Sequence, residues 1–224
     1  MEPGKFITCE GGEGTGKSTQ LKRLAERLAG TGIEALVTRE PGGTTGAEIV
    51  RKTILSGRVA ALGPFAEALL MNAARDDHLS EVIRPALKQG KWVLCDRFAD
   101  STRAYQGALG GVDLDLLKAF QKSVVGKNWP DMTLILDLDP EIGLQRARAV
   151  TLAEGGREAG DRFENEKIET HRRLRDAFLA IAQSEQKRCV VIDASKSIDA
   201  VANAIWDAVQ RRLPVPGPTA QAAS

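Results

Sequence analysis

The chain has 224 residues, of which 42% are hydrophobic and 27% charged, so it can bury the core of one large domain or two small ones. Its formal net charge of +1 excludes a global basic field of the kind that favours duplex DNA or membrane surfaces, and any phosphate binding must be local. No apolar stretch approaches the length of a membrane span, and the first residues, MEPGKFITCEGG, lack the layout of a signal peptide. We therefore expect a cytoplasmic protein that binds neither nucleic acid nor membranes.

Five short apolar runs predict buried strands, with helical patterns between them. In chain order the runs are KFITCE, IEALVT, WVLCD, TLILDL and CVVID, and none of them alternates strictly between apolar and polar residues. This pattern is typical of strands that are covered on both faces. Strands that alternate with helices predict right-handed crossovers, and therefore an α/β fold with a five-stranded parallel sheet and helices on both faces.

The helices are marked by apolar spacing, caps and breakers. The first follows Lys17 and ends before Gly30, and a long helical stretch runs from Pro64 to Gly90, where Pro85 can bend it. A third helix is indicated by the spacing of Leu116, Leu117, Phe120 and Val124. A fourth begins at Pro140, with Asp139 as its N-cap. The last has an apolar face formed by Ile198, Val201, Ala202, Ile205 and Val209. We expect one domain over residues 1–213 and a flexible tail, PVPGPTAQAAS, over residues 214–224.

The three cysteines have no metal-binding or disulfide spacing. Cys9, Cys95 and Cys189 each lie in or beside an apolar run, and no CxxC pair is present. We expect buried free thiols in a reducing compartment.

A phosphate-binding loop follows the first predicted strand. Gly11 to Ser18 fits the pattern G-x-x-x-x-G-K-[ST], with a strand before it and a helix after it, which is the context that this motif requires. Successive backbone N–H groups there form an anion nest at the positive end of a helix dipole, and the Lys17 ammonium reaches the β- and γ-phosphates. The predicted phosphate-binding residues are Gly11, Gly12, Glu13, Gly14, Thr15, Gly16, Lys17, Ser18 and Thr19.

A carboxylate for Mg²⁺ follows another strand. WVLCDR ends in Asp96 and Arg97, and an Asp in that position holds Mg²⁺ directly or through water. The Ser18 hydroxyl is the second predicted metal ligand.

Three classes of phosphate-loop protein have to be separated. A GTPase would normally carry N-K-x-D, which is absent, and a motor ATPase would usually be larger. A small-molecule kinase needs a second pocket with arginines for an anionic acceptor. The segments TREPGGT (38–44) and DRFADSTRAYQG (96–107) both follow predicted strands, so both open at the carboxyl edge of the sheet, where such folds bind ligands.

The chain resembles the thymidylate kinase family over nearly its whole length. The resemblance runs from FITCEGGEGTGKST through TREPGGT, AARDDH, DRFADSTRAYQG and LDLDPEIGLQRAR to DRFE, and TREPGGT with DR[YF]-x-x-S-x-x-AYQ is its most specific part. It implies a P-loop NTPase fold, a homodimer, and Mg²⁺-dependent transfer of the ATP γ-phosphoryl group to dTMP, giving dTDP.

The resemblance implies the residues that contact the acceptor. Glu13 binds the 3′-hydroxyl of the sugar, Arg97 clamps the dTMP phosphate, and Arg39 assists it or forms a structural salt bridge. A carboxylate suits this role, because it accepts strongly from a hydroxyl and repels a phosphate. A solvent-facing Glu13 is the alternative.

The remaining implied contacts surround the base and the sugar. Arg75 donates to thymine O4, Thr102 and Gln106 take part in base recognition, and Tyr105 either crowds a ribose 2′-hydroxyl or packs in the core. Family members usually have Phe in L-L-F where this chain has Met71 in LLM, so a thioether replaces the ring that stacks on thymine.

A segment rich in Gly and Arg, at about 146–162, resembles a lid that closes over ATP. The variable positions of GGEGTG hold no Arg or Lys, so the chain is similar to the family type in which lid arginines stabilise the transferring phosphoryl group. We expect Arg148 and Arg157 to be catalytic together with Lys17 and Arg97, and the next candidates are Arg146 and Arg162. The alternative for some of these lid arginines is a solvated basic helix end.

No strong base is required, because a phosphate acceptor is already ionised. His78 and His171 are therefore expected to be structural, although the R-x-x-H pattern places His78 beside the acceptor pocket. Two other functions stay open: a kinase for another nucleoside monophosphate or a deoxynucleoside, and an ATP-binding regulator without catalysis. The regulator is disfavoured by four intact residues: Lys17, Ser18, Asp96 and Arg97.

Overall fold

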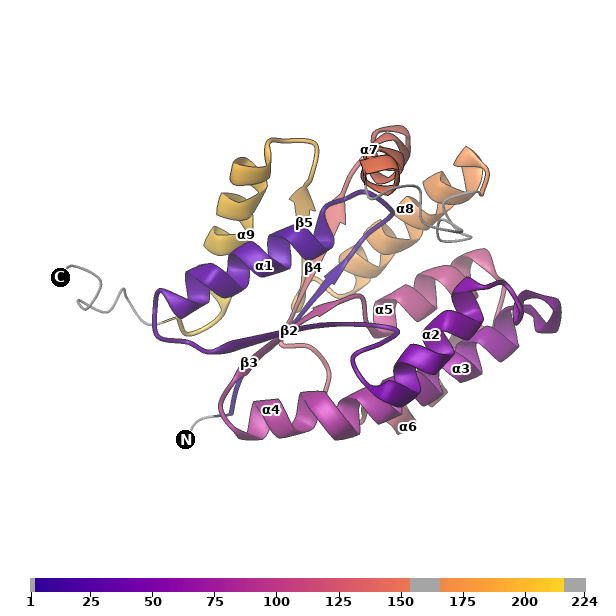
Figure 1. Cartoon of the computed structure of the whole chain (residues 1–224), viewed down its shortest axis with the longest axis horizontal. Helices are drawn as coiled ribbons and strands as arrows, with labels where there is room; N and C mark the ends of the chain where they lie inside the picture. The colour runs from indigo at the N-terminus through magenta and orange to yellow at the C-terminus, as the bar shows by residue number, and fades with distance from the viewer. Residues whose placement is uncertain (1–2, 154–165, 216–224) are drawn as a thin grey trace.

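The computed structural model describes residues 3–153 and 166–215, which form one sheet with helices around it (Figure 1). Residues 216–224 of the predicted tail and residues 154–162 of the predicted lid lie outside the described residues. The strands are β1 (Phe6–Glu10), β2 (Ala35–Arg39), β3 (Trp92–Asp96), β4 (Met132–Asp137) and β5 (Cys189–Asp193). The helices are α1 (Lys17–Ala29), α2 (Thr45–Leu55), α3 (Gly63–His78), α4 (Arg84–Lys88), α5 (Ala99–Thr102), α6 (Leu114–Val125), α7 (Pro140–Ala153), α8 (Ile168–Ser184) and α9 (Ile198–Arg212), with shorter helical turns η1 (Ala60–Leu62), η2 (Leu79–Ile83) and η3 (Arg103–Leu109).

The strands pair in the order β2-β3-β1-β4-β5, and every pair is parallel. This confirms the predicted α/β fold with a five-stranded parallel sheet. β1 lies in the centre, so the loop that follows it emerges between the ends of β3 and β4. Ligands of open parallel sheets bind outside the carboxyl ends of the strands.

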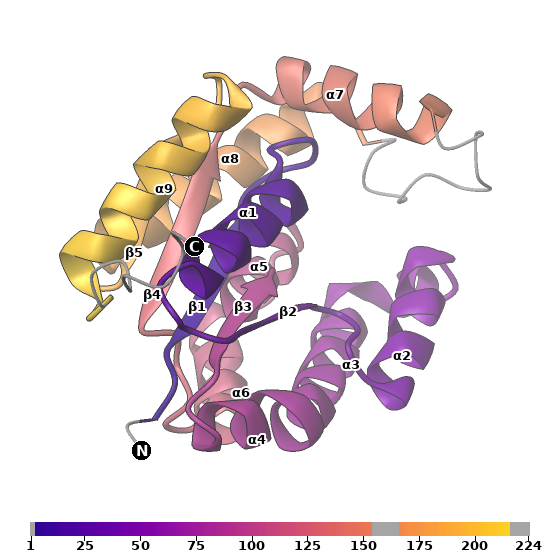
Figure 2. The same cartoon turned by 60° about the vertical axis from the view of Figure 1, so that its left-hand side comes forward.

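One face of the sheet is covered by α1 and α9, which lie side by side (Figure 2). Both helices bury an apolar stripe at helical spacing against side chains from four strands. The stripe consists of Leu21, Leu24 and Leu28 on α1 and of Val201, Ile205 and Val209 on α9.

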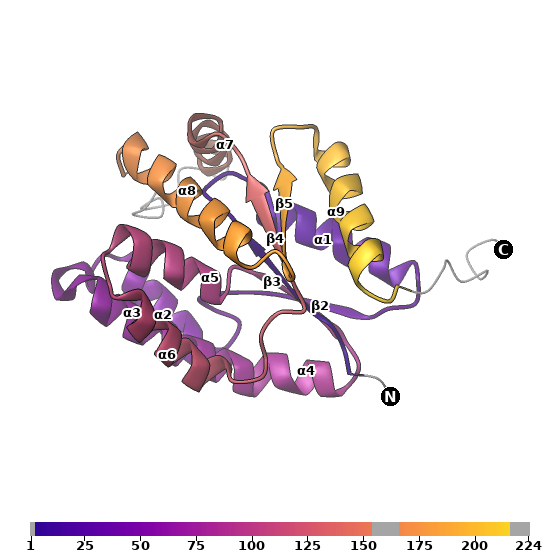
Figure 3. The ribbon, with the colours of Figure 1, turned by 180° about the vertical axis from the view of Figure 1, so that it is seen from behind.

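The opposite face is covered by α8 and by the helices that follow β2 and β3, as the view from behind shows (Figure 3). Leu174 and Phe178 of α8 pack on Ile135, and Phe98 packs edge-on against Phe6 with ring centroids 5.0 Å apart. All three cysteines are buried and free, as predicted. Burial raises the pKa of the Cys9 and Cys95 thiols well above the usual value, so both are neutral.

Two details of the sequence-based fold were wrong or missing. The edge strands are not covered on both faces, since Val37 in β2 is 39% exposed and Val191 in β5 is 45% exposed. The helix α2, capped by the Thr44 hydroxyl accepting from the Ala47 amide at 3.0 Å, was not predicted. The expected long helix is α3 continued by the wide π-helical turn η2 and then by α4, whose second residue is Pro85.

None of the described helices is by itself long and apolar enough to cross a membrane. Within the described part of the chain, α2 and the segment Ala60–Lys88 are together long and apolar enough, but they are bent by 79° relative to each other.

Candidate active site

The phosphate loop joins the central strand β1 to α1. Gly14 and Gly16 have positive φ angles of 65° and 89°, which a residue with a side chain rarely adopts. Lys17 is the first residue of α1, and its Nζ donates to the Gly12 carbonyl at 2.7 Å and to the Gly11 carbonyl at 3.2 Å. Burial and the nearby Arg97 lower the pKa of Lys17, and the carboxylates of Glu13 and Asp96 oppose that shift. The ammonium is thus held within the loop that the motif assigns to phosphate.

Ser18 and Asp96 meet at the mouth of this loop. The Ser18 hydroxyl donates a hydrogen bond to Asp96 Oδ2, although the two residues are 78 positions apart. Hydroxyl and carboxylate oxygens are the hard ligands that Mg²⁺ prefers, so this pair fits the predicted metal site. Among the described residues, no group of three or more His, Cys, Asp and Glu side chains has the arrangement of a metal site.

The Glu13 side chain contacts residues 96–107, which are called the acceptor segment below. Its Oε1 accepts from Arg97 Nη2 at 2.5 Å and from the Tyr105 hydroxyl at 2.9 Å. Burial alone would raise the pKa of Glu13, but Arg97, Lys17, Tyr105 and, most weakly, His171 outweigh it and lower the pKa to about 2. Its ionised form therefore stabilises the fold above about pH 4.5, and this contribution is lost as the pH falls toward about 2.

Arg97 is held in a conformation that is rare for a residue with a side chain. Its φ angle is +66°, and its amide donates to the Cys9 carbonyl at 2.9 Å, which fixes the segment after β3 to β1. Its guanidinium lies 5.1 Å from the centre of the Tyr105 ring and donates to the Gly11 carbonyl at 3.1 Å. Burial opposes the charge, but Tyr105, Glu13 and Asp96 raise the pKa of Arg97 above its usual value.

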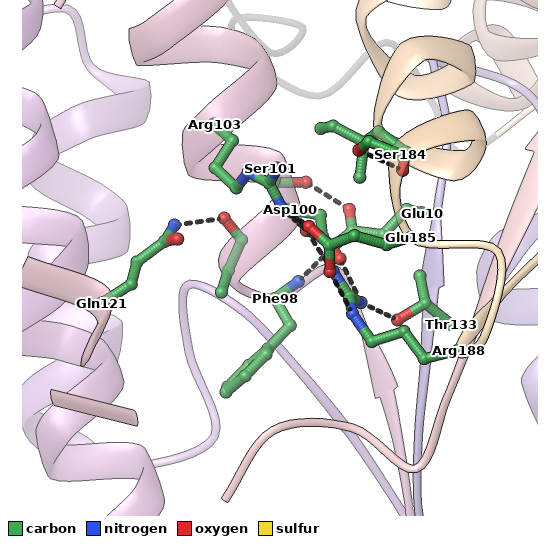
Figure 4. A network of polar contacts seen from close by, with 12 residues as sticks. Glu10, Phe98, Asp100, Ser101, Arg103, Gln121, Thr133, Ser184, Glu185 and Arg188 are labelled. Carbon is green, nitrogen blue, oxygen red and sulfur yellow. Dashed lines mark hydrogen bonds and ion pairs between the residues drawn. The ribbon is translucent and has the colours of Figure 1, made fainter. Parts of the chain in front are cut away.

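A buried polar network fixes the segment that follows Arg97 (Figure 4). Glu10, the last residue of β1, accepts from the Phe98 amide at 2.8 Å and from the Ser101 hydroxyl at 2.6 Å. Burial and the neighbouring Asp100 raise the pKa of Glu10 well above its usual range. Arg188 binds the Asp100 carboxylate through both terminal nitrogens, at 2.7 and 2.9 Å, so this carboxylate is paired inside the protein.

A large cavity of about 970 Å³ opens beside the phosphate loop. Of the predicted acceptor residues, Glu13, Arg39, Met71, Arg97, Tyr105 and Gln106 line it, together with Lys17, Ser18 and Asp96. The structure therefore brings the predicted phosphate, metal and acceptor groups to one site. A cavity of this size lies within the range of small-molecule and cofactor sites.

Arg75 and Thr102 lie behind the wall of the cavity. Both side chains are almost fully buried, and Arg75 Nη2 donates to Thr102 Oγ1 at 3.1 Å. Arg75 Nε donates to Glu40 Oε2 at 2.8 Å, and His78 Nδ1 lies 3.1 Å from the other Glu40 oxygen. Their roles in base recognition stay predictions, and His78 is fully buried beside the acceptor segment.

Arg39 forms the salt bridge that was the alternative to phosphate contact. Its Nη2 lies 2.8 Å from Glu48 Oε1, while its side chain remains 54% exposed and lines the cavity. Arg51, Ile54 and Leu55 of α2 also line the cavity, and sequence analysis missed all three. Their spacing of three and four residues, directly after TREPGGT, is the signal of one helix face.

The first part of the predicted lid is helical, because α7 extends to Ala153. Arg148 lies exposed on this helix, and Arg146 Nη1 donates to the Ala194 carbonyl at 3.0 Å, which ties α7 to the end of β5. Arg157 and Arg162 lie outside the described residues. The relative importance of these arginines stays a prediction.

A family model described as thymidylate kinase matches residues 9–205. This chain belongs to the thymidylate kinase family. A thymidylate kinase of Bradyrhizobium sp. (strain ORS 278) is 58% identical over 210 residues, which cover 94% of this chain and 91% of that protein. One of Nitrobacter winogradskyi (strain Nb-255) is 57% identical over 209 residues, 93% of this chain and 89% of that protein. The crystal structure of thymidylate kinase from Ehrlichia chaffeensis has a TM-score of 0.73 at 33% identity, and the match covers 93% of this chain and 100% of that one.

The similarity to thymidylate kinases is confirmed over most of the chain, including the segments from the phosphate loop to α9. The backbone of the phosphate loop lies directly against α7, the helix that precedes the predicted lid segment. A Cβ on Gly14 would lie 1.9 Å from the Gly143 carbonyl oxygen, and one on Gly143 would lie 2.4 Å from the Glu13 carbonyl oxygen. Two glycines thus allow α7 to touch the loop backbone directly.

We predict that Gly143→Ala lowers kcat/KM by about tenfold or more, equivalent to about 1.4 kcal/mol, because the added methyl displaces the Glu13–Gly14 peptide. Ala149→Ser, at an exposed position of the same helix, is the matched control. Steady-state kinetics with ATP and dTMP measure both variants. Wild-type kinetics for Gly143→Ala would mean that the contact between α7 and the loop is dispensable.

Proposed function

We propose that the protein transfers the γ-phosphoryl group of ATP to dTMP and thereby produces dTDP. The observation that carries the proposal is the position of Glu13, which comes from the phosphate loop but binds Arg97 and Tyr105 of the acceptor segment. Glu13 therefore belongs both to the proposed ATP site and to the proposed dTMP site. Membership of the thymidylate kinase family supports the same reaction.

The acceptor phosphate is proposed to bind Arg97, with Arg39 at the cavity wall. Arg97 carries a firmly held charge, and its guanidinium can make the paired hydrogen bonds that a phosphate accepts. On binding, the 3′-hydroxyl of the sugar donates to the Glu13 carboxylate, which stays ionised at neutral pH. Tyr105, whose hydroxyl donates to Glu13, is proposed to crowd a ribose 2′-hydroxyl.

Base recognition is proposed to involve Gln106, Arg75, Thr102 and Met71. Gln106 Nε2 donates to Glu67 Oε2 at 3.3 Å, whereas its buried Oε1 has no partner among the described residues. That oxygen can accept from the N3–H of thymine, and Arg75 is proposed to donate to a base carbonyl. Met71 replaces the expected aromatic ring on the cavity wall.

The phosphoryl donor is proposed to lie on the loop, with Lys17 on the β- and γ-phosphates and Mg²⁺ held by Ser18 and Asp96. When bound, Mg²⁺ supplies charge neutralisation between the phosphates. The donor base would occupy the end of the cavity lined by Arg146, Val150 and Ile198. Positioning and charge stabilisation then suffice for transfer, with Arg148 or Arg157 meeting the developing charge.

We also propose a homodimer that uses α3 and α6, which pack against each other. Phe65 and Leu69 on α3 and Leu114 on α6 are 44%, 44% and 48% exposed, which is an apolar surface that a second copy can cover. Sedimentation equilibrium is expected to give twice the chain mass for the wild type and a shift to monomer for Leu69→Glu. A monomeric wild type would contradict this proposal.

The three buried free thiols favour a reducing compartment, and we propose the cytoplasm. Cell fractionation measures this directly, and recovery in an oxidising compartment would contradict it.

We predict that dTMP is the preferred acceptor. ADP release is measured with ATP and Mg²⁺ and with dTMP, dUMP, dCMP, UMP, the ribose form of TMP, or thymidine. The expected kcat/KM for dTMP exceeds that for dCMP and for the ribose form by about 100-fold. The base of dCMP would mispair with a buried polar group, and the 2′-hydroxyl of the ribose form would clash with Tyr105. Thymidine lacks the phosphate that Arg97 binds and is expected to be inactive, and omission of Mg²⁺ is expected to abolish turnover.

Two other results of this acceptor panel would change the proposal in different ways. Comparable turnover of several monophosphates would retain the kinase chemistry and show that Met71 has relaxed base selection. No turnover with any acceptor would contradict the proposed function and favour an ATP-binding regulator.

A further inference from the structure

A second, smaller cavity borders the phosphate loop. Its walls are Gly11, Gly12, Glu13 and Thr15 of the loop, the end of β4, and one side each of α7 and α8. About 20 Å³ of it is open to a sphere of the size of water, which is room for one water molecule. This cavity is distinct from the large one, although both touch Glu13 and Thr15.

His171 of α8 lies on the wall of this cavity with an unsatisfied polar atom. The side chain is only 5% exposed, and its buried Nε2 has no hydrogen-bond partner among the described residues. A buried ring nitrogen without a partner is costly, and one that faces a cavity of this size is normally satisfied by an internal water. The proposed reaction makes no use of this histidine.

Apolar side chains such as Leu144 and Phe178 form much of the remaining cavity wall, and one ion pair lies among them. Arg175, one helical turn after His171, binds both oxygens of Asp137 at 2.6 and 2.9 Å. The loop backbone is already pressed against α7 at Gly143, where no side chain fits. A water in the cavity would therefore complete the support of the loop between α7 and α8.

We propose that His171 is a positioning residue, which holds the Gly11–Glu13 backbone through one internal water and thereby aims the Glu13 carboxylate at the acceptor sugar. This inference rests on the proposed role of Glu13 as the partner of the 3′-hydroxyl. His171 touches neither nucleotide in this scheme. The proposed water contact would join α8, which follows the predicted lid segment in the chain, to the loop that carries Glu13.

The test is binding of dTMP and of its 3′-deoxy analogue to the full chain, measured by calorimetry for the wild type, His171→Phe, His171→Gln and Leu174→Met. Phe keeps the ring shape without a polar atom, whereas Gln can still bind a water. Leu174→Met perturbs the apolar packing of the same helix and leaves the cavity lining unchanged. Thermal unfolding shows whether each variant is folded.

His171→Phe is expected to weaken dTMP binding by about tenfold, and His171→Gln and Leu174→Met by less than about threefold. The analogue, which has no hydroxyl for Glu13, is expected to bind His171→Phe and the wild type equally. Unchanged dTMP binding by His171→Phe would overturn the proposal. Equal weakening of both ligands would also overturn it, since that is the effect of a general structural role.

Failure of the proposed function would look different. If wild-type protein bound dTMP and the analogue equally, the assignment of Glu13 to the 3′-hydroxyl would be wrong, whatever His171 does. Crystal structures of the wild type and His171→Phe then show whether His171 positions the loop through a water. A water on His171 Nε2 and a displaced Glu13 in the variant support the positioning role, and an unchanged loop overturns it.

Discussion

Glu13 and Arg97 come from loops that follow different strands, and the ion pair between them joins the phosphate loop to the acceptor segment. The pair places a carboxylate beside the most anionic part of the site, which is tolerable only because Arg97 and Lys17 surround it with positive charge. Their charges hold Glu13 in its ionised form, and Arg97 fixes its carboxylate by a direct hydrogen bond. The proposed separation of the phosphoryl donor from its acceptor within one cavity depends on this arrangement.

The rest of the site keeps Arg97 in place. Its positive φ angle is maintained by the bond from its amide to β1, and the residues after it are fixed by Glu10 at the end of the same strand. Asp100, bound by Arg188, adds a second buried anchor (Figure 4). Such a buried polar network adds little net stability, because the loss of hydration offsets much of the attraction between its charges. Its main effect is to hold the side chains in one arrangement. Here that geometry positions a guanidinium.

The sequence was sufficient for the sheet, the phosphate loop and the grouping of Lys17, Ser18, Asp96, Glu13 and Arg97, because each of these follows a strand whose end lies at one edge. It was insufficient for features that depend on distant partners. The exposure of β2 and β5 follows from strand order, and the burial of Arg75 behind the cavity follows from its pairing with Glu40. The contact of Gly143 with the phosphate loop could not be predicted either, since a glycine inside a helical pattern does not indicate which residue lies beside it.

The central claim is that Glu13 and Arg97 together build the acceptor site and leave the donor site to the loop backbone and Lys17. A double-mutant cycle of Glu13→Gln and Arg97→Lys, with Kd measured for dTMP and for ATP, tests it most directly. We predict that each single variant weakens dTMP binding by about tenfold, that the double variant loses less than the sum, and that ATP binding changes by less than about threefold. Unchanged dTMP binding with weakened ATP binding would contradict the claim and assign the pair to the donor.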